Sequence, residues 1–176
     1  MKLSGSPLDL RFTTVVSLPR PGGGGPLLSL RPLPLGFPER LGARQIAPPL
    51  PPVRVARDSQ GRPLRQADGS AVLLPDEHDA DYRRERDLYQ RRLAVLSIVE
   101  ALGSDDRIEF ETRADAFPDD WRPYADKLHD ELVRAGFTAG DLVWLCRQVM
   151  QLSNLLDSHL KESEARFFSA GPPTAV

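Results

Sequence analysis

The strongest structural signal in the chain lies in residues 121–156, WRPYADKLHDELVRAGFTAGDLVWLCRQVMQLSNLL. In its first part, apolar residues recur at spacings of three and four, which is typical of an amphipathic helix. These residues are Trp121, Tyr124, Leu128, Leu132 and Ala135. Gly136 follows, and glycine is the residue most often found just past a helix end because it adopts positive φ. We therefore predict a helix that ends near residue 135.

A second helix is predicted to begin directly after this corner. Thr138 and Asp141 have the spacing of a capping box, and Phe137 and Leu142 are placed as in a hydrophobic staple. The apolar stripe of this helix consists of Leu142, Leu145, Cys146, Val149 and Leu152. The helix pair is a structural signal and carries no chemistry of its own.

The two halves of the chain differ in composition. Residues 1–75 hold 13 of the 17 prolines and carry 10 Lys and Arg against 4 Asp and Glu, whereas residues 76–176 carry 13 against 21. We therefore predict four regions. They are an N-terminal strand or hairpin with an apolar segment (1–46), a Pro/Arg-rich linker or arm (47–75), a helical domain (76–170) and a tail (171–176).

The N-terminal region has the pattern of two strands. Residues 8–18 alternate between apolar and polar side chains, apart from Val15, which is typical of a half-buried strand. The glycine run 22–25 is a flexible break, and no Gly-Lys-Ser/Thr follows it as a phosphate-binding loop requires. Residues 27–35 are a candidate return strand, at a sheet edge because Pro32 and Pro34 lack N–H donors.

Three further segments of the first half each leave two interpretations open. Residues 33–41 are either a loop packed on the protein's own helices or a docking peptide for a partner groove. Residues 47–52 are expected to be extended polyproline, as a spacer rather than an SH3-type ligand. Residues 53–74 hold two turn signals and form a hairpin or a mobile arm. The arm's four arginines lack interleaved aromatic residues for stacking on nucleic-acid bases.

The second half is predicted to be helical. A long helix is expected from Asp76 to Leu102, with its first half in solvent or on a partner and its second half in the core. Residues 107–112 alternate as in a short strand, and a last helix after Leu156 has Leu156, Leu160 and Phe167 as its stripe. The predicted fold class is mainly α, a helical bundle of about four helices with an N-terminal β-hairpin or strand and a Pro-rich extended arm.

No catalytic, metal-binding or cofactor-binding residues are predicted. His78, His129 and His159 each lack a second ligand at metal-binding spacing. Residues 77–81 lack the glycine and terminal Glu of a calcium loop. Cys146 lies on an apolar helix face and is expected to be a buried thiol. The chain shows no signal peptide and no apolar run near the ~20 residues of a membrane span. We therefore expect a non-enzymatic, cytosolic protein.

The order of these features resembles the tail assembly chaperones and related small tail proteins of tailed phages and prophages. The resemblance covers most of residues 27–168 and contains no invariant catalytic motif. It is carried by LPLGF at 33–37, the acidic helix start after Asp68-Gly69, RLAVLSIVEAL at 92–102, EFET at 109–112, AGFTAGDLV at 135–143 and LSNL at 152–155. It implies a helical, non-catalytic protein that holds the tape-measure protein soluble while tail-tube subunits polymerise around it. Such a protein is expected in the host-cell cytoplasm, or associated with the virion.

The sequence leaves three classes of function open. In the preferred one, a chaperone, the partner is the tape-measure or tail-tube protein, and the candidate docking residues are Leu33, Leu35, Phe37, Phe167 and Phe168. The second is a tail, neck or baseplate subunit that stays in the particle, with the strand of residues 8–18 added to a neighbour's sheet. The third and least favoured is a nucleic-acid adaptor that uses the basic half. No membrane contact is expected, and a homo-oligomer is compatible with each class.

Overall fold

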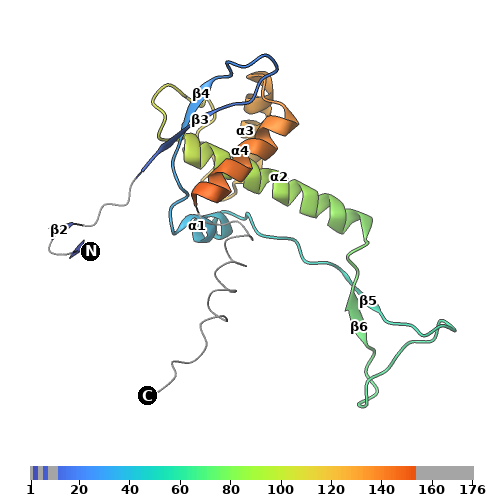
Figure 1. Cartoon of the computed structure of the whole chain (residues 1–176). Helices are drawn as coiled ribbons and strands as arrows, with labels where there is room; N and C mark the ends of the chain where they lie inside the picture. The colour runs from blue at the N-terminus through green and yellow to red at the C-terminus, as the bar shows by residue number, and fades with distance from the viewer. Residues whose placement is uncertain (1, 4–5, 8–11, 154–176) are drawn as a thin grey trace, which may run out of the picture.

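The computed structural model describes residues 2–3, 6–7 and 12–153 of the 176 residues. In this part of the chain, four α-helices are accompanied by small two-stranded antiparallel sheets (Figure 1). The helices are α1 (Phe37–Ala43), α2 (Ala80–Leu102), α3 (Arg122–Arg134) and α4 (Ala139–Leu152), with a short 3-10 turn at Ala114–Ala116. The strand pairs are β1 (Lys2–Leu3) with β2 (Ser6–Pro7), β3 (Thr14–Ser17) with β4 (Leu27–Leu30), and β5 (Val53–Val55) with β6 (Leu73–Pro75). The fold is therefore mixed α and β rather than a mainly α bundle.

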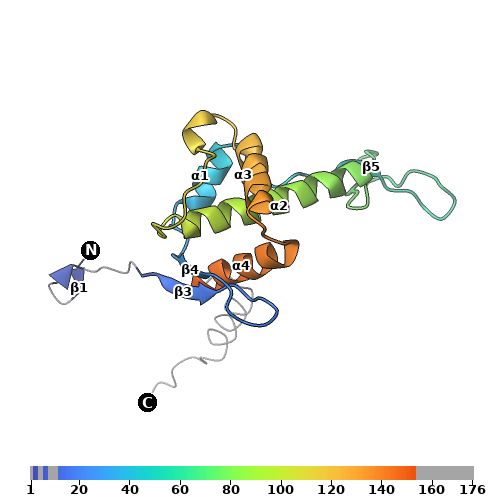
Figure 2. The same cartoon turned by 90° about the horizontal axis from the view of Figure 1, so that it is seen from above.

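The body is built around the second half of α2. Helices α1 and α3 lie on one side of α2, and α4 with the β3–β4 hairpin lies on the other (Figure 2). Val95 and Leu96 belong to the core cluster shared with α1 and α3. Ile98 and Ala101 belong to the cluster shared with α4 and the hairpin. The first half of α2 extends beyond both clusters, as the sequence predicted.

Helix α2 begins four residues later than predicted, because Asp79 caps it. The Asp79 carboxylate accepts a hydrogen bond from the Tyr82 backbone N–H at 2.8 Å. Asp76 belongs to the arm instead, where its N–H donates to the Pro52 carbonyl at 2.7 Å. The acidic run before α2 therefore marks the junction between arm and helix.

The corner between α3 and α4 confirms the sequence prediction. Gly136 has a φ of 90°, the left-handed conformation that favours glycine. The Asp141 N–H donates to Thr138 Oγ1 at 3.2 Å, and the Thr138 N–H donates to Asp141 Oδ2 at 2.8 Å, so the capping box is complete. The capped start fixes the direction in which α4 leaves the corner.

The N-terminal hairpin is also confirmed where the structure describes it. Strands β3 and β4 pair antiparallel across the glycine-rich loop, with Thr14 opposite Leu30 and Ser17 opposite Leu27. Leu18, Leu28 and Leu30 are buried against α2 and α4. Residues 8–11 of the predicted first strand lie outside the described residues. The hairpin thus covers one side of α2 as part of the body.

Helix α1 was missed by the sequence analysis. Residues 33–41 were expected to be a loop packed on the protein's own helices or a docking peptide, but Phe37–Ala43 form two turns of helix with a proline near the start. A helix this short presents only one apolar pair at helical spacing, Phe37 and Leu41, which is too little to establish a period. Both side chains are buried in the core cluster with α2 and α3.

The predicted strand at residues 107–112 is wrong, since these residues form a loop. Their backbone donors find side-chain acceptors instead of a neighbouring strand. The Glu131 carboxylate on α3 accepts from the Glu111 N–H at 2.7 Å and from the Thr112 N–H at 3.1 Å. This side-chain contact replaces a sheet ladder. The predicted last helix after Leu156 lies outside the described residues.

The burial of Phe37 gives a stability prediction. We expect Phe37→Ala to lower the free energy of unfolding by about 3–5 kcal/mol, because it leaves a cavity between α1, α2 and α3. Leu35 is 98% exposed, so Leu35→Ala is expected to change the free energy of unfolding by less than about 0.5 kcal/mol. Urea denaturation followed by circular dichroism measures both values. Equal losses for the two variants would contradict the assignment of Phe37 to the core.

Candidate protein-binding site

The structure separates the five residues predicted to dock on a partner. Leu35 lies in the turn before α1 and is 98% exposed. Leu33 is half-buried between the two core clusters, and its N–H donates to Ser153 Oγ at 2.9 Å. Phe37 is only 3% exposed, which corrects its proposed docking role because the side chain is part of the core. Phe167 and Phe168 lie outside the described residues.

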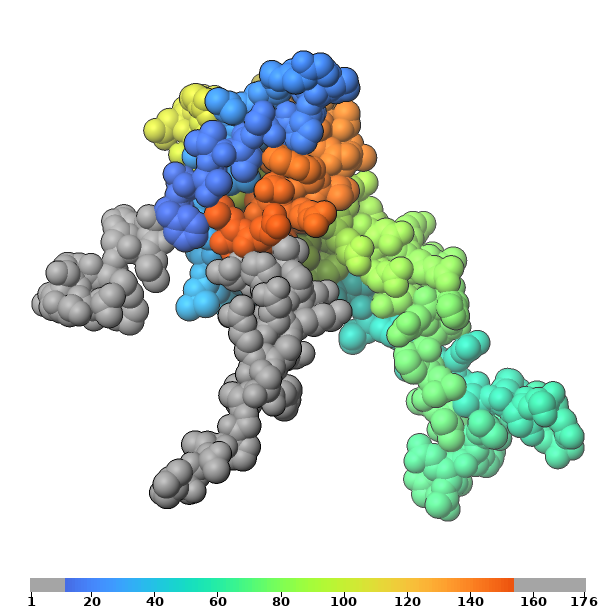
Figure 3. All heavy atoms as spheres, viewed as in Figure 1, coloured from blue at the N-terminus to red at the C-terminus, as the bar shows by residue number. Residues whose placement is uncertain are grey.

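A different surface has the form of a protein-binding site. An open groove of about 800 Å³ lies between the first half of α2 and α4, with the end of α3 and the α3–α4 corner beside it. Figure 3 shows α4 on the surface of the body, next to the exposed half of α2. The apolar lining comprises Ala94, Val95, Val133, Phe137, Ala139, Leu142, Val143, Cys146 and Met150. The polar lining comprises Asp87, Gln90, Arg91, His129 and Arg147.

The groove forms because α2 and α4 pack together over only part of their lengths. Leu145 and Val149 of α4 are buried against the second half of α2. The first half of α2 continues past this contact with no described residue covering the space. Val143 is 72% exposed and Val133 is 51% exposed. These aliphatic side chains stand at the groove as apolar surface that the described residues leave open to solvent.

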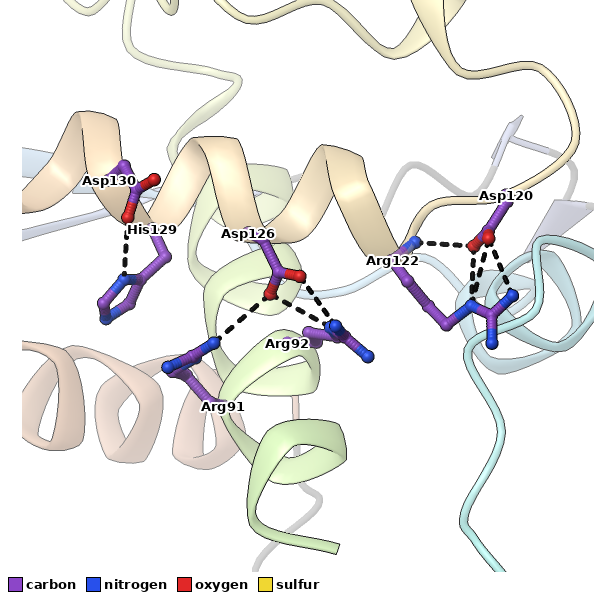
Figure 4. Close-up of polar contacts among 7 residues, drawn as sticks. All are labelled: Arg91, Arg92, Asp120, Arg122, Asp126, His129 and Asp130. Atoms are coloured by element: carbon purple, nitrogen blue, oxygen red, sulfur yellow. Dashed lines mark hydrogen bonds and ion pairs between the residues drawn. The ribbon is translucent and has the colours of Figure 1, made fainter. Parts of the chain in front are cut away.

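An ion-pair network holds α3 against α2 beside the groove (Figure 4). Arg92 donates to both oxygens of Asp126, with Nε to Oδ1 at 3.0 Å and Nη2 to Oδ2 at 2.6 Å. Arg91 Nη2 reaches Asp126 Oδ1 at 3.4 Å. The hydrogen bonds from Arg92 hold the pKa of Asp126 below its ordinary value, and those to Asp126 raise the pKa of Arg92. The network holds Arg91 at the groove, beside the end of α3 that lines it.

Of the two histidines that the structure describes, His129 lies at this groove. Its ring lies 3.6 Å from the Asp130 carboxylate, and its side chain is 25% exposed. Its position beside α4 was not predicted from the sequence. The available signal was Val133, an aliphatic residue on the same side of α3 and outside the main apolar stripe.

A second hollow of about 400 Å³ lies on the other side of α2, between α1 and the start of the polyproline segment. Its apolar lining includes Phe37, Leu41, Tyr89 and Leu93. Met150, in the last turn of α4, lines this hollow and the larger groove. The two apolar hollows therefore both reach the end of α4.

The arm of residues 53–75 is a second exposed surface, and it projects from the start of α2 and divides into two loops (Figure 1). Where the two loops separate, three backbone hydrogen bonds of 2.8–2.9 Å form a closed ring. The Ala56 N–H donates to the Val72 carbonyl, the Val72 N–H to the Leu64 carbonyl, and the Leu64 N–H to the Ala56 carbonyl. Arg57 and Arg65 each donate to the glycine carbonyl of their own loop, at 2.7 and 2.6 Å. The arm thus holds its shape through its own backbone and side chains.

The arm also exposes aliphatic side chains. Val53 is 65% exposed, Leu73 55% and Leu74 46%. The four arginines of the arm are exposed as well, and among the described residues only Arg54 faces a carboxylate, that of Asp76 at 3.7 Å. The arm therefore offers a mixed apolar and basic surface away from the body.

Within the part of the chain that the structure describes, no three His, Cys, Asp or Glu side chains gather closely enough to hold a metal ion. None of the described helices is long and apolar enough to cross a membrane. Comparison of the chain with protein-family models, with curated proteins and with solved structures found no match. The groove and the arm are therefore the features of the structure that bear on function.

The Asp126 network predicts how the groove wall responds to acid. Folding lowers the pKa of Asp126 from its ordinary value of 3.8. The ion pair therefore stabilises the folded protein at pH values above 3.8, and this stabilisation is lost as the pH falls below 3.8. We expect Asp126→Asn to lower the unfolding free energy at neutral pH and to flatten its decline in acid.

The control is Asp130→Asn, on the same helix, since Asp130 is 76% exposed and pairs only with His129 among the described residues. Thermal melts between pH 7 and pH 3 measure both variants. The same pH dependence in Asp126→Asn and in the unmodified chain would exclude the network as a stabilising contact.

Proposed function

We propose that this chain is a non-catalytic protein-binding protein, and that the groove between α2 and α4 binds an amphipathic helix of a partner. The observation that carries the proposal is the exposure of Val133 and Val143 at the walls of the groove. Grooves of this kind between helices bind the apolar face of a partner helix through residues at i, i+3, i+4 and i+7. Arg91, Arg147 and Asp87 at the same groove would orient the polar sides of that helix.

Within this class, we favour a tail assembly chaperone of a tailed phage or prophage. The tape-measure protein is the proposed partner, held soluble until tail-tube subunits assemble around it. The resemblance in the order of sequence features supports this assignment. A groove that accepts helices also suits a long, coiled-coil-rich partner, because such a protein presents many amphipathic helical segments of similar chemistry.

A specific observation supports a second candidate, a structural tail, neck or baseplate subunit. The arm exposes Val53, Leu73 and Leu74 far from the body, and it keeps its shape without packing on either core cluster. Such an arm suits a permanent contact with a neighbouring subunit. A retained subunit is present in purified particles in a fixed copy number, whereas a chaperone is absent from them.

The groove hypothesis predicts that Val143→Asp reduces capture of the helical partner by at least about tenfold, because a buried unpaired charge opposes docking by more than 1.4 kcal/mol. Val143 is 72% exposed, so the variant is expected to fold normally. The measurement is a pull-down with tagged full-length chain from its native cells, followed by mass spectrometry. The matched control is Val15→Asp on β3, where Val15 is 62% exposed and away from the groove.

Equal capture by both variants and the unmodified chain would overturn the groove as the binding site. Loss of capture in both would indicate a general effect of the added charge. The arm is tested in the same experiment with Val53→Asp. A structural subunit is expected to lose its place in the particle in that variant, whereas a groove-binding chaperone is expected to capture its partner normally.

A further inference from the structure

We propose that two copies of this chain pair through β3, antiparallel and edge to edge, so that their β3–β4 hairpins form one continuous four-stranded sheet. Each hairpin is a two-stranded sheet with two outer edges. The two edges differ in how their backbone groups are satisfied, and this difference selects β3 as the site of pairing. The pairing involves neither the groove nor its partner helix, so it stands apart from the proposed function.

Hydrogen bonding within the hairpin decides which backbone groups face outward. The Leu18 N–H donates to the Pro26 carbonyl at 3.0 Å, so these two residues form a hydrogen-bonded pair. Hydrogen-bonded and non-hydrogen-bonded pairs alternate along antiparallel strands. In the observed register, the alternation assigns the ladder bonds to the pairs Thr14–Leu30 and Val16–Leu28. The residues between them, Val15 and Ser17 on β3 and Leu27 and Ser29 on β4, direct their N–H and carbonyl groups away from the hairpin.

The outer edge of β4 is satisfied by the body of the same chain. The Ser29 N–H donates to Asp105 Oδ2 at 2.8 Å. The Leu27 carbonyl accepts a hydrogen bond from Arg107 Nη2 at 2.9 Å. Just after the strand, the Arg31 N–H donates to a carbonyl in the last turn of α2 at 3.0 Å. Another strand could therefore join this edge only by displacing β4 from the end of α2.

The outer edge of β3 has no such cover from the described residues. No other described residue pairs with the outward backbone groups of Val15 and Ser17. Residues 12–19 contain no charged side chain, whereas unpaired strand edges are commonly protected by charges, prolines or bulges. The arm's hairpin, in contrast, has Arg54 in the middle of β5 and Pro75 at the end of β6. Strand β3 is therefore the sheet edge most open to pairing.

A second copy of β3 completes this edge symmetrically. Two identical strands can pair antiparallel about a two-fold axis. With the axis at Val15, the two Val15 residues exchange both of their backbone hydrogen bonds, and Thr13 of each copy does the same with Ser17 of the other. This register forms about six hydrogen bonds. A shift by one residue would bring outward-facing groups against groups already bonded to β4.

The side chains of the outer face also match in this register. Val15 is 62% exposed and Leu27 is 56% exposed, and both lie on the face opposite the buried Leu28 and Leu30. Across the axis the two Val15 side chains stand directly opposite each other, with a Leu27 on either side. Cross-strand pairs of β-branched residues stabilise antiparallel sheets. No like charges meet, because the paired strands are uncharged.

The pairing leaves the other two exposed surfaces in place. The hairpin lies at the end of α2, whereas the arm projects from its start (Figure 1). The residues that line the groove include none from the hairpin. Each copy in the dimer therefore keeps its own groove and its own arm.

The test measures the dissociation constant of the dimer by sedimentation equilibrium of the full-length chain. A contact between two strand edges is at the small end of specific interfaces, so chain concentrations from about 1 to about 300 μM cover the expected transition. Val15→Lys and Val15→Asp each place like charges opposite one another across the axis, and each is expected to weaken the dimer by at least about tenfold. An equimolar mixture of the two variants is expected to regain the dimer, because opposite charges then meet.

A proline variant separates the backbone contribution from that of the side chain. Val15→Pro removes an N–H that faces outward and leaves the β3–β4 ladder complete, and proline is tolerated at such edge positions. We expect this variant to be monomeric. The matched control is Val15→Thr, which keeps the N–H donor and the β-branched shape and is expected to remain dimeric. Circular dichroism melts confirm that each variant is folded.

Four results would overturn the proposal. The first is an unmodified chain that stays monomeric over the whole concentration range. The second is a dimer that persists in Val15→Lys and Val15→Asp, since the copies would then meet on another surface. The third is a dimer lost in Val143→Asp and kept in the Val15 variants, which would assign self-association to the groove. The fourth is a mixture that fails to regain the dimer, which would exclude the two-fold register.

This proposal and the proposed function fail separately. Because each copy keeps its own groove, Val15→Asp is expected to capture the helical partner as the unmodified chain does, although its dimer is weakened. If the dimer behaves as expected but Val143→Asp captures its partner normally, β3 pairs two copies and the proposed function is wrong. If the chain is monomeric while Val143→Asp loses its partner, the groove binds a partner and β3 does not pair.

Discussion

The structure depends on the burial of the second half of α2 on two sides. Val95 and Leu96 pack toward α1 and α3, and Ile98 and Ala101 pack toward α4 and the β3–β4 hairpin. All four side chains are no more than 3% exposed. Because one helix joins both clusters, a displacement of α2 exposes both of them. Apart from Tyr89, the first half of α2 is not part of this core, and so it is available to form one wall of the groove and to carry the arm.

Local signals in the sequence predicted the elements whose ends are marked by specific residues. The α3–α4 corner has Gly136 and the Thr138–Asp141 box, and the hairpin has a glycine run between two alternating stretches, so both were found. Helix α1 has only Phe37 and Leu41 to mark it, and the core decides its conformation. The loop at 107–112 alternates like a strand, but the carboxylate of Glu131, distant in sequence, binds its N–H groups.

The candidate site could not be predicted from the sequence, for a related reason. A groove is formed by two surfaces together, and the space between α2 and α4 depends on where the packing contact between these two helices ends. Val143 and Val133 lie outside the main stripes of their helices, and only their placement beside α2 makes them walls of one groove. Leu33, Leu35 and Phe37 show the opposite case. They are equally apolar in sequence, yet the fold leaves one exposed, half-buries another and buries the third.

An exposed apolar groove poses a physical problem for any protein that must remain dispersed, because such surfaces associate with one another. Under the proposed function, a partner helix covers Val133 and Val143, so that the partner and other copies of this chain compete for the same apolar walls. The partner must then bind more tightly than another copy of the chain does, and this requirement sets a threshold that weak apolar helices would not pass.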